Sequence, residues 1–169
     1  MTWHLVLVAL AALGFGLGSA VIPVLNAEVY AVATAAAGPT VAVVSVLGVA
    51  IGQTAGKVAM LVVVRRGMDS TWLTRWRTKR PPKAPATEQP AWRRALARWS
   101  AALLRQMDRP VVGGLVVLLS SVVGLPPLAA VTVLAGMRSL PLPVFTVAVG
   151  IGRVVRFAAL AWPVVRLAH

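Results

Sequence analysis

The stretch TVAVVSVLGVAIGQTAGKVAMLVVVRR, residues 40–66, decides the fold class. From Thr40 to Val64 it is almost entirely apolar, and it is long enough for a helix that crosses a bilayer at about 1.5 Å per residue. It ends in Arg65-Arg66, and such basic residues mark the cytoplasmic end of a spanning helix. The sequence therefore predicts a transmembrane helix that runs inward over residues 40–64.

The composition of the whole chain also indicates that the protein lies in a membrane. Of its 169 residues, 59% are apolar and only 12% are charged, whereas a soluble domain carries about a quarter of its residues as charges. The net charge of +13 would suggest a nucleic-acid partner in a soluble protein. On a hydrophobic chain, Lys and Arg instead mark the loops left in the cytoplasm. We therefore expect a membrane protein and no nucleic-acid binding.

Residues 66–109 are predicted to form a basic cytoplasmic insert. Twelve basic and three acidic residues lie between Arg65 and Arg109, a net charge of +9. The segment 81–90, PPKAPATEQP, holds four prolines and predicts an extended linker. In 91–107, Trp and Leu recur at helical spacing with Arg on the opposite face, which is typical of an amphipathic helix on anionic lipid. A partner-binding or regulatory role for this helix is the alternative.

Shorter apolar segments are predicted to form two hairpins that enter the membrane and turn back. Pro23 separates segment 3–22 from 24–37, and Gly124-Leu-Pro-Pro127 separates 111–124 from 128–137. Such re-entrant backbone is tolerated only where protein or a water-filled cavity satisfies its polar groups. A last spanning helix is predicted at 144–165. The alternative that 3–22 spans the membrane fully stays open, because the segment is long enough.

The two halves of the chain repeat the same order of hairpin and spanning helix. Val49-Ala-Ile-Gly52 corresponds to Val149-Gly-Ile-Gly152 one hundred positions later, and the proline breaks and following glycines fall at similar places. Because the insert fixes the cytoplasmic side, the halves are expected to have opposite orientations. The predicted fold is an all-α polytopic membrane protein built as an inverted repeat, with halves at 1–65 and 110–169 and a substrate site between the hairpins.

Four ionisable groups fall inside apolar segments, where a charge costs about 2.5–3.5 kcal/mol on insertion scales. They are Glu28, Lys57, Arg153 and Arg156. The two arginines are three residues apart, so both can project from one helical face and hold a phosphate or carboxylate. One acid cannot compensate three cations, and we therefore expect an anionic ligand to supply the missing charge.

The remaining polar groups of these segments have two interpretations each. Glu28 could pair with a cation, or it could take up and release a proton. Lys57 could contact the ligand, or its long side chain could extend to the interface. Asn26 and Gln53 could satisfy the backbone freed at the hairpins or contact the substrate, the first role being favoured. Gly48, Gly52 and Gly56 form a stripe that favours close packing of another helix.

The sequence argues against an enzyme and against a bound cofactor. It contains no cysteine, and Glu28 is the sole acid outside the insert, so no metal-ligand cluster is expected. His4 and His169 lie at the ends of the chain and are expected to be solvated. There is no Ser/His/Asp set and no phosphate-binding loop for ATP.

Motifs in both halves resemble the DedA superfamily, also called VTT-domain or SNARE-associated Golgi proteins. The motifs are Pro23-Val-Leu-Asn-Ala-Glu28-Val-Tyr30, Gly52-Gln-Thr-Ala-Gly56-Lys57, Gly124-Leu-Pro-Pro127 with Ala135-Gly136, and Phe145 with Gly152-Arg153-Val-Val-Arg156-Phe157. The resemblance implies an inner-membrane protein with facing re-entrant hairpins that translocates lipid, such as undecaprenyl phosphate or a phospholipid. It also implies dependence on the proton-motive force. The family's membrane-embedded acid maps onto Glu28, and its arginines map onto Arg153 and Arg156.

Together these observations predict a flippase-like transporter for an anionic lipid in the cell inner membrane. The expected substrate-binding residues are Arg153, Arg156, Lys57, Asn26 and Gln53, and Glu28 is expected to pair with a cation or couple to protons. Membrane lipids are the expected partners, and assembly into a homo-oligomer is open. The alternatives are a membrane scaffold whose basic insert binds lipid or a partner, and an exporter of small molecules or ions.

Overall fold

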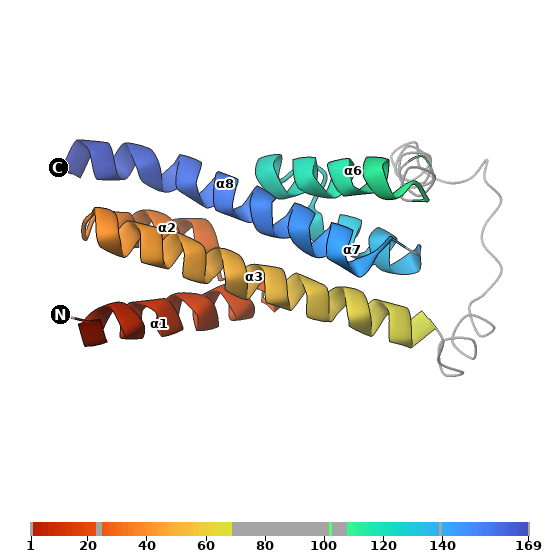
Figure 1. Cartoon of the computed structure of the whole chain (residues 1–169), viewed down its shortest axis with the longest axis horizontal. Coiled ribbons are helices and arrows are strands. Elements are labelled where there is room, and N and C mark those ends of the chain that lie inside the picture. The colour runs from red at the N-terminus through yellow and green to blue at the C-terminus, as the bar shows by residue number, and fades with distance from the viewer. Residues whose placement is uncertain (1, 23–24, 69–101, 103–107, 139, 169) are drawn as a thin grey trace, which may run out of the picture.

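The computed structural model describes residues 2–22, 25–68, 102, 108–138 and 140–168 (Figure 1). The main helices are α1 (Thr2–Val21), α2 (Ala27–Ala35), α3 (Pro39–Met68), α6 (Pro110–Val123), α7 (Leu128–Met137) and α8 (Leu142–Ala168). No strand occurs among these described residues, so the predicted all-α class is confirmed for them. The helices α1, α3 and α8 are long and apolar enough to cross a membrane.

The helices end where the sequence places its breaking residues. Gly38, with a φ of 119°, separates α2 from α3, and α3 begins at Pro39, where a missing N–H costs nothing. The helix α6 ends at Gly124, whose φ of 84° lies in the left-handed region that favours glycine. The predicted segment limits at 111–124 and 128–137 therefore agree with α6 and α7 to within one residue.

Three predicted boundaries, one in α3 and two in α8, are wrong by a few residues. The helix α3 continues to Met68 instead of ending at Val64, so the first residues of the predicted insert are helical. Near this end, Arg65 donates a hydrogen bond from Nη2 to the Leu140 carbonyl, which ties the last turns of α3 to the segment before α8. The helix α8 extends beyond the predicted 144–165 at both ends. Most of the insert, with the proline-rich linker and the amphipathic helix predicted at 91–107, lies outside the described residues.

Glycines allow the closest helix contacts, as predicted for the stripe on α3. A Cβ built on Gly52 would lie 2.2 Å from the Leu13 carbonyl oxygen of α1, and one on Gly56 would lie 2.4 Å from the Ala20 Cβ. The helix α8 uses Gly152 in the same way, because a Cβ there would lie 2.5 Å from the Ser121 Cβ of α6. The stripe therefore packs α1 directly on the backbone of α3.

The short helices α2 and α7 pack beside different parts of the long helices. Both chain ends lie at one end of the molecule, whereas α3 and α7 finish at the opposite end (Figure 1). The helix α2 packs against both α3 and α8, and α7 packs against α3. One core cluster joins α2 to the start of α3 and to Phe157, and a second joins α7 to Leu61 of α3 and Phe145 of α8. The C-terminal ends of α1 and α6 thus lie toward the middle of the long helices α3 and α8 (Figure 1).

The outer surface of the helices is strongly apolar. Large apolar side chains are exposed on α1, α3, α6 and α8, among them Leu7, Val63, Leu119 and Trp162. In water such a surface would favour aggregation or binding, whereas in a bilayer it contacts lipid chains. This surface and the three candidate spans agree with a membrane protein.

Candidate functional site

A polar cavity of about 300 Å³ lies between the start of α2 and the long helices α3 and α8. Its walls come from the segment 25–28, from α3 and from α8. The lining residues are Leu25, Asn26, Ala27, Glu28, Gln53, Arg153 and Phe157. Four of the six residues predicted to bind substrate or pair with a charge are therefore in its wall, and the other two, Lys57 and Arg156, are outside the lining. The cavity is polar although the surrounding fold is apolar.

Asn26 shapes one wall by starting α2. Its Oδ1 accepts hydrogen bonds from the backbone N–H groups of Glu28 and Val29, at 3.0 and 3.4 Å. This N-cap satisfies donors that the chain break would otherwise leave without a partner. Of the two roles expected for Asn26, the structure shows the first, although the residue also lines the cavity.

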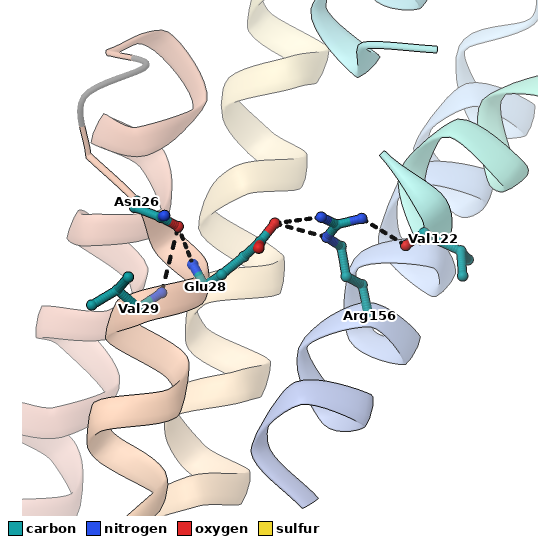
Figure 2. A network of polar contacts seen from close by, with 5 residues as sticks. All are labelled: Asn26, Glu28, Val29, Val122 and Arg156. Atoms are coloured by element: carbon teal, nitrogen blue, oxygen red, sulfur yellow. Dashed lines mark hydrogen bonds and ion pairs between the residues drawn. The ribbon is translucent and has the colours of Figure 1, made fainter. Parts of the chain in front are cut away.

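Glu28 and Arg156 form an ion pair beside the cavity (Figure 2). Arg156 donates from Nε and Nη2 to Glu28 Oε1 at 2.9 and 2.6 Å, and from Nη1 to the Val122 carbonyl at 2.9 Å. The Arg156 side chain is 21% exposed and that of Glu28 is 39% exposed. Because Val122 is in the last turn of α6, the cation also caps the negative end of that helix. Arg156 therefore joins α2, α6 and α8.

Arg153 has a different environment from Arg156. It lines the cavity, and its guanidinium lies 5.9 Å from the ring centroid of Phe157. Its Nε is buried and has no hydrogen-bond partner within the described part of the chain. The two arginines that the sequence predicts as one clamp are thus divided: Arg156 is bonded to protein groups, and Arg153 retains an unused donor.

Gln53 has one satisfied and one unsatisfied end. Its Nε2 donates to Ser19 Oγ at 2.8 Å, and Ser19 Oγ in turn donates to the Gly16 carbonyl at 2.9 Å. Gln53 is only 6% exposed, and its Oε1 is buried without a partner among the described residues. Ser19 was not among the predicted site residues, although its hydroxyl in the apolar run 3–22 is a signal that could have identified it.

Lys57 is buried but lies outside the cavity lining. Its Nζ donates to the Ala20 carbonyl at 2.8 Å, one residue before the end of α1, and the residue is 7% exposed. The ammonium group thus faces the negative end of the α1 dipole. The structure shows a cap on α1, and the alternative that the side chain extends to the interface is wrong.

Comparisons of this chain with protein-family models, with curated proteins and with solved structures find no match. The resemblance to the DedA superfamily therefore stays a prediction. Within the described residues, no group of three or more His, Cys, Asp or Glu side chains is close enough to hold a metal ion.

Proposed function

We propose that this protein is a transporter that translocates an anionic lipid across the membrane. The observation that carries the proposal is the buried Nε of Arg153, which has no partner in the described part of the chain and belongs to a residue in the wall of a polar cavity within an apolar helical fold. Guanidinium stays charged in such surroundings and offers several donors in a fixed plane. A phosphate group entering the cavity would use those donors.

The charges around the cavity also favour an anionic occupant. Among the described residues, Glu28 is the only acid in the lining, and its Oε1 is already bonded to Arg156. Lys57 is bonded to a backbone carbonyl, which supplies only part of a negative charge. Arg153 therefore has no ion pair with a carboxylate within the part of the chain that the structure describes. A charged side chain at membrane depth is costly unless it is paired, so a ligand that brings negative charge is favoured.

Several observations support the inverted repeat proposed for this fold. Gln53 and Arg153 are one hundred positions apart, follow the matching segments 49–52 and 149–152, and line the same cavity. The C-terminal turn of α1 is bonded by Lys57 of α3, and that of α6 is bonded by Arg156 of α8. In known inverted repeats, such an arrangement allows access to a central site from either side in turn.

The orientation that we propose places the insert in the cytoplasm. The ends of α3 and α7 and the start of α6 lie at one end of the molecule (Figure 1), and they carry Arg65, Arg66, Arg138 and Arg109. This basic end fits the cytoplasmic face of the plasma or inner membrane. By resemblance to the DedA superfamily, the lipid would be a polyprenyl phosphate such as undecaprenyl phosphate, or a phospholipid.

The test is translocation of a fluorescent undecaprenyl phosphate, and in parallel of a fluorescent phosphatidylglycerol, in proteoliposomes that contain the full chain. Arg153→Gln should lower the rate by roughly 10- to 100-fold, because one charge-assisted contact to the headgroup is lost. Arg166→Gln is the matched control. It removes the same charge from α8, but Arg166 is exposed and stacks on Trp162 away from the cavity. Equal rates in wild type and Arg153→Gln, or no protein-dependent translocation of either lipid, would overturn the proposal.

A further inference from the structure

The hydroxyl proton of Ser19 determines which end of the Gln53 amide bonds Ser19. A serine hydroxyl has one O–H donor, and Ser19 commits it to the Gly16 carbonyl at 2.9 Å. Ser19 Oγ can therefore only accept from Gln53, so the group 2.8 Å away must be the amide nitrogen. In this arrangement the amide nitrogen of Gln53 is the end that bonds Ser19. Oε1 is consequently the end of Gln53 that lacks a partner.

A buried carbonyl oxygen without a donor is costly. Leaving such an acceptor dehydrated and unpaired destabilises a structure by roughly 1–3 kcal/mol. Two residues of the cavity wall thus carry groups of opposite kind that have no partner among the described residues, namely the Gln53 Oε1 acceptor on α3 and the Arg153 Nε donor on α8. An occupant that carries only acceptors would satisfy Arg153 and leave Gln53 unpaired.

We propose that Gln53 determines headgroup specificity by accepting a hydrogen bond from an O–H group of the anionic ligand that Arg153 binds. The inference rests on the proposed function, because it assigns the chemical class of the same ligand. The ligand class is a phosphate anion that carries a hydroxyl donor. A headgroup with a fully esterified, donor-free terminus would bind less well, since it has nothing to give to Oε1.

Two chemical sources provide this combination of groups. A phosphate monoester carries a P–OH group when it is singly protonated, and its second pKa is about 6. A phosphate diester carries no P–OH, but a glycerol headgroup on it supplies hydroxyl groups. In both cases an anionic oxygen and an O–H donor belong to one headgroup.

The experiment measures binding affinities by isothermal titration calorimetry, in which short-chain lipids are added to the full chain in detergent. The first pair is dihexanoyl phosphatidylglycerol and dihexanoyl phosphatidylpropanol, which have the same charge and differ by the headgroup hydroxyls. The second pair is dihexanoyl phosphatidate and its methyl ester, titrated at about pH 5, where both carry about one negative charge and differ by the P–OH group. We expect the hydroxyl-bearing member of one pair to bind about tenfold more tightly, and the pair that shows this preference identifies the source of the donor.

The variant Gln53→Met removes the acceptor at similar side-chain length. Both members of the pair should then bind with about equal affinity. Thr54→Val is the matched control, because it removes a polar group from the next position of α3, where Thr54 bonds the Ala50 carbonyl and does not line the cavity, so the preference should persist. Equal affinity within both pairs for the wild-type chain would overturn the inference, whether or not Gln53→Met folds. An unchanged preference in folded Gln53→Met would also overturn it.

The same lipids separate this inference from the proposed function. A binding preference that depends on Gln53, without translocation in proteoliposomes, would overturn only the transport proposal. Translocation with equal binding of both members of each pair would overturn only the role of Gln53. Absence of binding for all four lipids would overturn both.

Discussion

Arg156 and Glu28, which are 128 residues apart in the chain, meet through two hydrogen bonds to one carboxylate oxygen. The same guanidinium bonds the carbonyl of Val122 at the end of α6 (Figure 2). One side chain of α8 therefore contacts both the first turn of α2 and the last turn of α6. Arg153, one turn earlier on α8, has no such bond, and its buried Nε is without a hydrogen-bond partner among the described residues.

The first prediction concerns the strength of this pair. A double-mutant cycle with Glu28→Gln and Arg156→Gln should give a coupling free energy of about 1–2 kcal/mol, because the pair is partly buried and lies in apolar surroundings. The measurement is thermal unfolding of the purified chain in detergent. The matched control is the pair of Asp108 and Arg138, whose side chains are 50% and 42% exposed and 3.3 Å apart. Its coupling should be below about 1 kcal/mol, and a larger coupling there than at Glu28 would contradict the prediction.

The second prediction concerns the contact of α1 with α3. Gly52→Ala should lower the unfolding free energy by about 1–3 kcal/mol, because the new Cβ would meet backbone atoms of Leu13 and Leu17 and no side-chain rotation can relieve the overlap. Gly14→Ala on α1 is the control, since a Cβ there has no other atom within 4 Å. Unfolding followed by circular dichroism checks both, and Gly14→Ala should be neutral. Equal losses for the two variants would show that the close approach is not decisive.

The third prediction concerns the end of α6. Gly124→Ala should destabilise the chain for two reasons, namely the positive φ of 84° and a Cβ that would lie 2.8 Å from Arg156 Nη1. In an Arg156→Ala background the second cause disappears, so the loss should be smaller while the backbone strain stays. Thermal unfolding of the four proteins measures the difference. Equal losses of stability in both backgrounds would show that contact with Arg156 does not contribute to the effect of Gly124→Ala.

The fourth prediction concerns orientation, and the absence of cysteine from the chain makes it direct to test. His4→Cys and Leu167→Cys place a thiol near the two termini, which lie at one end of the molecule (Figure 1). Arg66→Cys and Met137→Cys place a thiol at the opposite end. A membrane-impermeant maleimide applied to intact cells or right-side-out vesicles should label the first two and spare the last two. Labelling of Arg66→Cys from outside would reverse the proposed topology.

The fold was largely predictable because its main signals are local. Apolar length specifies α3 and α8, and proline and glycine specify the breaks around α2 and between α6 and α7. The glycine stripe on α3 was predicted to accept a close neighbour, and α1 is that neighbour. The helix ends were less accurate, because tertiary contacts such as that of Arg65 with Leu140 extend a helix beyond its most apolar part.

The site was predictable in its residue types and less so in their roles. The cost of a charge in hydrocarbon drew attention to Arg153, Arg156, Lys57 and Glu28 before any contact was known. Spacing could not tell which arginine pairs with Glu28, because residues three apart on a helix differ by only about 60° in direction and about 4.5 Å in height. Small changes in how α2 crosses α8 would exchange the two partners.

By itself, the sequence determined the membrane environment, the helical class, the positions where helices are interrupted, and the presence of more cations than anions in the apolar segments. These properties depend on neighbouring residues and their sums along the chain. The tertiary structure alone decided that Arg156 bonds Glu28, that Lys57 bonds the end of α1, and that Gln53 and Arg153 share one cavity. Hydrogen bonds act over about 3 Å, and only helix packing brings groups from distant segments that close.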